Sequence, residues 1–176
     1  MAAIELNGLT KSYGTSRGID DVTLSVRSGE MFGFIGPNGA GKSTTIRTML
    51  GLLSPSRGSV HLLGQDATRH GDKVRRRIGY LPSEVHYYNE MTSRELLTYH
   101  ADLMGLKNAT AEMEVLATTL ELDLDRFISE LSFGNKKKCA IVQALLHEPD
   151  LLLLDEPTSG LDPLIQNRFF ELLEAR

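Results

Sequence analysis

A glycine-rich loop between an apolar segment and a helical pattern constrains the fold of this chain more than any other feature. Residues 36–44 read Gly-Pro-Asn-Gly-Ala-Gly-Lys-Ser-Thr, which matches the phosphate-binding loop pattern in full. Backbone N–H groups of such a loop form a concave anion site, and the helix that follows adds the positive end of its dipole. Lys42 can then reach the β- and γ-phosphates of a nucleotide, and the Ser43 hydroxyl can ligate Mg²⁺. The residues expected to bind the phosphates are Gly36, Pro37, Asn38, Gly39, Ala40, Gly41, Lys42, Ser43 and Thr44.

The hydrophobic pattern predicts an α/β fold. Residues 4–9 alternate as a strand does, and residues 31–35 are a short apolar run that predicts a buried strand directly before the loop. Residues 90–147 read as helices only, and Leu151–Leu154 has the character of a buried strand again. A helical insertion in an α/β domain explains this order better than two independent domains.

Composition excludes several classes of protein. The chain has 176 residues with a formal charge of −4, which argues against a general nucleic-acid binder. No apolar run approaches the roughly 20 residues that a membrane-spanning helix needs, and the N-terminus lacks the apolar core of a signal peptide. The single cysteine, Cys139, cannot form an internal disulfide, which fits a reducing cytosol.

An acidic pair supplies the second chemical signal. Asp155 and Glu156 follow the apolar run Leu151–Leu154 directly. Asp155 could hold Mg²⁺ through water, and Glu156 could polarise a water for attack on the γ-phosphate. An acidic pair after a strand is weak evidence by itself, but it gains weight beside a phosphate-binding loop.

Together with three further motifs, these residues resemble the nucleotide-binding domain of ABC transporters. Leu131-Ser132-Phe133-Gly134-Asn135 stands where that family has its signature sequence, residues 159–162 resemble its D-loop, and Tyr13 stands where an aromatic ring stacks on adenine. The resemblance implies a P-loop NTPase with a RecA-like core sheet, an antiparallel β subdomain and a helical insertion. We expect one such domain, with an α/β core of residues 1–82 and 150–176 around a helical subdomain of residues 83–149.

The resemblance also implies ATP and Mg²⁺ as cofactors, and a partner. Ser43 and Asp155 are the expected metal ligands and Glu156 the catalytic residue. In the family, two subunits form a head-to-tail dimer in which the signature of one binds ATP held by the other. The expected contacts in trans are Ser132, Phe133, Gly134 and Asn135, with Asp162 as a dimer contact.

Two departures from the family pattern stand out. Ser83 occupies a position where the family usually has Gln, and its shorter side chain cannot offer an amide oxygen at the same reach. The family's switch histidine would lie beyond Arg176, where the sequence ends, so we expect a domain that is incomplete at its C-terminus. This leaves open whether the chain hydrolyses ATP or only binds it.

Three functions compete. The leading expectation is the ATP-driven motor subunit of an exporter of drugs, antibiotics or peptides, held at the cytoplasmic face of the membrane by a separate permease subunit. The others are a non-hydrolysing ATP-binding fragment or regulatory subunit, and a soluble ABC-type ATPase that acts on ribosomes or DNA. The absence of a basic surplus disfavours the last, so no nucleic-acid partner is expected. The basic runs 75–77 and 136–138 are interpreted as solvated faces.

Overall fold

The computed structural model describes residues 1–14 and 16–176, which fall into two compact units, Met1–Ile78 and Gly79–Arg176. The division does not decide whether residues 1–82 and 150–176 form one core around a helical subdomain, which stays a prediction.

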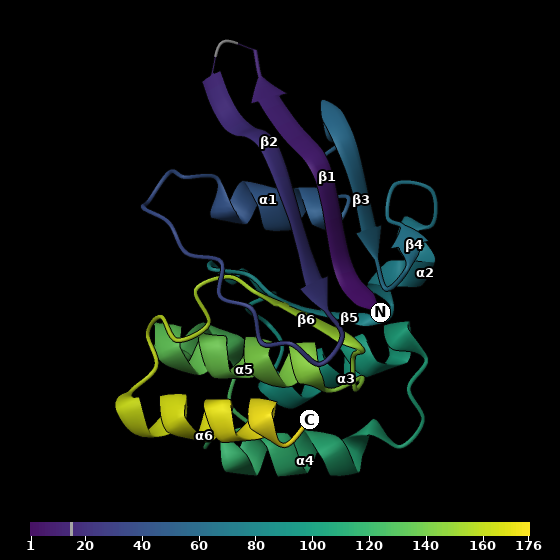
Figure 1. The fold of residues 1–176 in the computed structure, drawn as a ribbon. Coiled ribbons are helices and arrows are strands. Elements are labelled where there is room, and N and C mark those ends of the chain that lie inside the picture. The colour runs from purple at the N-terminus through teal and green to yellow at the C-terminus, as the bar shows by residue number, and fades with distance from the viewer. Residues whose placement is uncertain (15) are drawn as a thin grey trace. The chain divides into compact units, whose positions relative to one another are not determined.

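The first unit is built on an antiparallel sheet (Figure 1) with the order β2-β1-β3-β4. Its strands are β1 (Ala2–Tyr13), β2 (Ser16–Arg27), β3 (Arg57–Leu62) and β4 (Gln65–Asp66). Alternate side chains of β1 and β3, among them Leu6, Val60 and Leu62, are buried, as expected for a sheet with one face against a core. The helices of this unit are α1 (Lys42–Met49), which contacts β2, and the short α2 (Gly71–Arg75).

The second unit combines helices with a small parallel sheet. Strand β5 (Ile78–Leu81), which starts at the unit boundary, pairs with β6 (Leu151–Leu154). The helices are α3 (Ser93–Met104), α4 (Ala109–Thr119), α5 (Phe133–Leu145) and α6 (Pro163–Glu174), with a 3₁₀ turn, η1, at Ile128–Glu130. Their apolar faces share one core with Leu81, in which Leu97, Leu116, Ile141 and Phe169 are almost fully buried.

Local sequence rules account for the ends of several helices. Thr92 and Glu95 form a capping box at the start of α3, and Gly105 ends it in the left-handed conformation. Ser132 caps α5 and Asp162 caps α6, each with a side-chain oxygen that accepts a backbone N–H. None of the helices in the described part of the chain is long and apolar enough to cross a membrane.

The predicted buried strand over residues 31–35 is wrong. The segment is not a strand, and its large side chains are exposed, with 71% of Met31 and 93% of Ile35 accessible to solvent. A buried strand needs hydrogen-bonding neighbours and cover on both faces. The four-stranded sheet of its own unit does not include this segment, so its apolar residues have no strand to pair with there.

Candidate functional site

The phosphate-binding loop lies in the first unit and leads into α1. Gly41 is the N-cap of α1, and no side chain caps this end of the helix, so its first N–H groups are available to an anion. Gly41 has φ +93°, and a Cβ there would lie 2.4 Å from Cγ2 of Ile19 and 3.0 Å from the carbonyl oxygen of Gly18. Only glycine fits this position without a shift of the backbone.

Lys42 folds back over the loop that precedes it. Its ammonium donates to the carbonyl oxygens of Gly36 at 2.7 Å and Pro37 at 3.0 Å. The loop is closed by a backbone hydrogen bond from the Ala40 N–H to the Pro37 carbonyl at 3.1 Å. The cation is therefore held at the loop itself, where phosphate oxygens could replace the two carbonyl acceptors.

Tyr13 belongs to the same neighbourhood. The residue is 46% exposed, and the Lys11 ammonium lies 5.4 Å from the centroid of the Tyr13 ring. A Cβ on Gly18 would lie 3.1 Å from Cε2 of this ring, while the carbonyl of Gly18 approaches Gly41. Gly18 therefore lies between the Tyr13 ring, which is expected to stack on adenine, and Gly41 of the phosphate-binding loop.

The two acidic residues lie in the second unit, at the end of β6. Asp155 is 3% exposed, and its N–H donates to the carbonyl of Leu81 at 2.8 Å. Within the described part of the chain, its Oδ2 atom is buried with no hydrogen-bond partner. Buried carboxylate oxygens are almost always paired or bound to a cation, so this orphaned atom fits the predicted Mg²⁺ ligand. Glu156 is exposed and has φ +49°.

The signature residues and the D-loop pack against each other within the second unit. The Ser132 hydroxyl accepts from the Asn135 N–H at 3.3 Å. A Cβ on Gly134 would lie 2.5 Å from the carbonyl oxygen of Gly160, and a Cβ on Gly160 would meet the Phe133 ring at 2.4 Å. This close approach requires glycine at both positions. Phe133 as a whole residue remains 53% exposed.

Asp162, the expected dimer contact, has a role within its own chain. Its Oδ1 accepts from the Ile165 N–H at 3.1 Å, which caps α6. The N-cap role does not test the predicted contact with a second subunit.

Lys137 is a residue of this region that sequence reasoning missed. The solvated face expected for residues 136–138 is wrong for Lys137, which is 0% exposed, and for Lys138, which is 9% exposed. Lys137 precedes the buried residue Ile141 by one helical turn, and this i, i+4 spacing was the available signal. Burial lowers the pKa of Lys137, and the negative charges of Asp155 and Glu156 oppose that shift.

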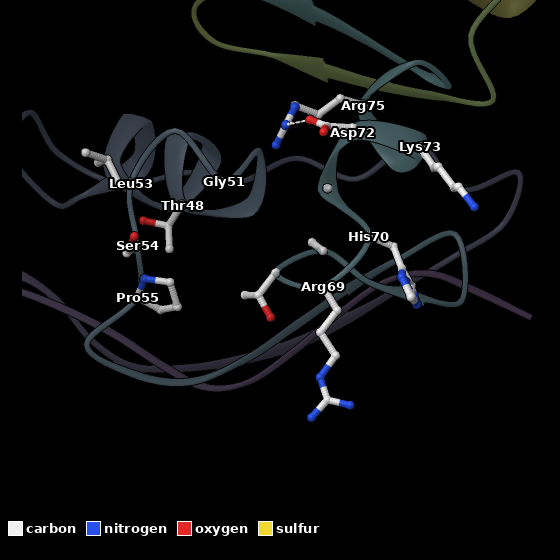
Figure 2. Close-up of a pocket in the computed structure, with 13 residues that line it drawn as sticks. Thr48, Gly51, Leu53, Ser54, Pro55, Arg69, His70, Asp72, Lys73 and Arg75 are labelled. Atoms are coloured by element: carbon white, nitrogen blue, oxygen red, sulfur yellow. Dashed lines mark hydrogen bonds and ion pairs between the residues drawn. The ribbon is translucent and has the colours of Figure 1, made fainter.

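A separate pocket of about 550 Å³ lies in the first unit (Figure 2), lined by residues from the end of α1 and from the segment that leads into α2. Arg75 donates to the Leu50 carbonyl at 3.1 Å and pairs with Asp72. The pocket contains none of the predicted site residues, because it lies at the C-terminal end of α1 and the phosphate-binding loop lies at the other end.

The predicted site residues therefore form two groups, each described within its own unit. Tyr13 and the phosphate-binding loop come together in the first unit. The acidic pair, the signature residues and Asp162 belong to the second. Among the described residues, no group of three or more His, Cys, Asp or Glu side chains could hold a metal ion. Mg²⁺ commonly binds through one or two side chains together with phosphate oxygens and water.

Comparison with known proteins gives consistent matches. The family model for ABC transporters matches residues 19–159. The chain is 39% identical over 162 residues to the bacitracin transport ATP-binding protein BcrA of Bacillus licheniformis, covering 92% of this chain and 53% of that protein. It is 37% identical over 178 residues to the Nod factor export ATP-binding protein I of Paraburkholderia xenovorans, covering 99% of this chain and 59% of that protein.

A solved structure described as an ATP binding subunit of an ABC transporter superposes with a TM-score of 0.89 at 37% identity. The match covers 98% of this chain and 74% of that one. The expected fold, that of a P-loop NTPase cassette, is confirmed by this match. The chain spans only 53% and 59% of the lengths of the two transport proteins.

Proposed function

The chain belongs to the ABC transporter family, as its motifs predicted, and we propose that it is the ATP-binding and ATP-hydrolysing part of a motor subunit of an exporter. The observation that carries the proposal is the phosphate-binding loop, in which an uncapped helix start, Gly41 and the Lys42 ammonium lie at one place. The half-exposed Tyr13 ring beside it offers a face on which adenine can stack, a contact worth roughly 1–3 kcal/mol.

We assign Ser43 and Asp155 as the residues that would hold Mg²⁺. The Ser43 hydroxyl stands in the first turn of α1, and Asp155 offers the buried oxygen that has no other partner among the described residues. When bound there, the ion would neutralise negative charge on the phosphates.

Glu156 is proposed as the residue that orients and activates the attacking water. A carboxylate in this role accepts a proton from the water as the water attacks phosphorus. Its exposure at the end of β6 leaves it accessible to substrate, unlike its buried neighbour Asp155.

The start of α5 at the signature residues supports a second subunit as the partner of this chain. Ser132 is the N-cap of α5, so its hydroxyl and the first N–H groups of the helix lie close together. A helix start of this kind is a suitable site for a phosphate. We infer a head-to-tail dimer in which Ser132–Asn135 contact ATP bound by the other copy, with Asp162 at the dimer contact.

The exporter assignment rests on the relatives, whose names refer to bacitracin transport and Nod factor export. We propose by analogy that this chain drives transport through a separate transmembrane permease and is held by it at the cytoplasmic face of the membrane. Which substrate is exported would be determined by that permease.

The test is phosphate release from the purified chain beside two variants. Glu156→Gln should retain ATP binding and lose turnover, since the amide keeps the shape of the side chain but cannot accept a proton. Lys42→Ala should lose Mg-ATP affinity in a calorimetric titration. ATP binding without turnover in the unmodified chain would reject hydrolysis and leave a nucleotide-binding subunit, while unchanged affinity in Lys42→Ala would contradict the assignment of the loop.

A further inference from the structure

The side chain of Lys137 joins three segments that lie far apart in the sequence. It projects from the second turn of α5 and is fully buried. Its ammonium donates to the carbonyl oxygen of Pro82 at 2.8 Å and of Ser83 at 3.2 Å, and makes a longer contact of 3.5 Å with that of Asp155. Pro82 and Ser83 follow β5, and Asp155 follows β6. One cation is therefore bound to the backbone at the carboxyl ends of both strands.

Packing alone does not explain a lysine at this position. Burial of an ammonium opposes folding unless acceptors replace its water, and an apolar side chain of similar length would fill the same space without that opposition. The three carbonyl oxygens supply the missing acceptors. The environment is thus built to accept a cation at the ends of the two strands.

The contact with the Asp155 carbonyl restrains the backbone of the next residue, Glu156. The Asp155 carbonyl belongs to the peptide group that leads into Glu156, whose φ of +49° is a left-handed conformation that side-chain-bearing residues seldom adopt. A hydrogen bond to that carbonyl restrains the plane of the peptide group and so the direction in which Glu156 leaves the strand. The bond to Ser83 restrains the peptide group that leads into Glu84 in the same way.

We propose that Lys137 is a positioning residue for ATP hydrolysis. By binding the backbone after β5 and after β6, it fixes the direction of Glu156 and ties both strand ends to the helix that begins at the signature residues. The hydrolytic part of this inference rests on the function proposed above, whereas the restraint on the backbone does not.

The experiment compares Lys137→Met with a matched control, Lys138→Met, in the full chain. Lys138 is also buried on α5 and also donates to a backbone carbonyl, but its acceptor, Glu121 at 3.3 Å, lies outside both strand-end segments. Steady-state ATPase kinetics and hydrogen–deuterium exchange of residues 82–86 and 155–160 are measured for both, below the melting temperature of each variant. Lys137→Arg, which retains the charged donor, is the rescue variant.

We expect Lys137→Met to lower kcat by about 10-fold or more while KM for ATP changes by less than about twofold, because a misdirected catalytic group reduces turnover rather than substrate binding. Exchange in both segments should increase, and Lys137→Arg should recover part of kcat. Lys138→Met should change neither kcat nor exchange in these segments, although it lowers the melting temperature. If Lys137→Met does not fold, Lys137→Gln replaces it in both assays, with a smaller loss of kcat and a smaller increase in exchange expected because its shorter side chain keeps a neutral donor.

The outcomes test the restraint on the backbone and the role of Lys137 in hydrolysis separately. Unchanged exchange in Lys137→Met overturns the positioning role whether or not the chain hydrolyses ATP. Increased exchange with unchanged kcat, or an equal loss of kcat in Lys138→Met, overturns its link to hydrolysis. A lack of turnover in the unmodified chain rejects the proposed hydrolysis and with it the hydrolytic role of Lys137, while the exchange data still decide the restraint on the backbone.

Discussion

Replacement of Gly41 by alanine should destabilise the first unit more than the same change at Gly39. Both glycines have positive φ, +93° at Gly41 and +80° at Gly39, so both substitutions force an L-residue into a disfavoured conformation, at about 1–2 kcal/mol. They differ in the space around the new Cβ. At Gly39 nothing lies within 4 Å, whereas at Gly41 the Cβ would lie 2.4 Å from the Ile19 side chain and 3.0 Å from the Gly18 carbonyl.

The steric conflict sets the size of the difference. Forcing an extra methyl group into a packed site typically costs about 1–3 kcal/mol. We therefore expect Gly41→Ala to lower the free energy of unfolding by about 2–5 kcal/mol, against about 1–2 kcal/mol for Gly39→Ala. Because Gly41 caps α1, the displacement should also misplace the N–H groups that face the phosphates.

The assay is urea denaturation of both variants without nucleotide, followed by fluorescence or circular dichroism, with ATP affinity measured separately by calorimetry. The difference between the two unfolding free energies isolates the steric conflict, since the conformational cost is common to both. Equal destabilisation of the two variants would refute the close approach of Gly41 to Ile19 and Gly18, and with it the local geometry that places the loop beside the Tyr13 ring.

Two further predictions concern the second unit. Gly134→Ala should push the D-loop away, because its Cβ would lie 2.5 Å from the Gly160 carbonyl; we expect a lower melting temperature and faster proteolysis near Gly160, and an unchanged melt would contradict the packing. His100 is partly buried, and burial followed by the charge of His147 lowers its pKa below the ordinary value of 6.5. Because the folded state then binds the proton less readily than the unfolded state, stability is fully present above pH 6.5 and declines as the pH falls from 6.5 towards the lowered value. The melting temperature should fall less on acidification in His100→Gln than in the unmodified chain, and parallel pH profiles would refute this.

Features that depend on a few neighbouring residues were predictable from the sequence. The phosphate-binding loop, the capping box at Thr92 and Glu95, and the start of α5 at Ser132 all follow from groups within one helical turn. At Thr92 and at Ser132 the side-chain oxygen accepts the backbone N–H of the residue three positions further along the chain. These features could therefore be predicted from neighbouring residues without knowledge of tertiary contacts.

Features that depend on distant segments were not predictable. The apolar run over residues 31–35 has the composition of a buried strand, but whether it is one depends on neighbouring strands that the run itself does not specify. The burial of Lys137 depends on carbonyl groups at Pro82 and Ser83, 55 and 54 residues away in the chain. A basic triplet on a helix suggests a solvated face until those acceptors are located.

Ser83 shows how a change of side chain can leave a backbone contact intact. Its side chain is shorter than the Gln that is usual at this position in the family. In the structure, the part of Ser83 that contacts Lys137 is its carbonyl oxygen, a group that every residue carries. The side chain at position 83 can therefore vary without loss of this contact, whereas the donor cannot, because only a long side chain with a polar end reaches the carbonyl groups after both strands. The specific requirement for the contact falls on position 137 of α5 rather than on the segment after β5.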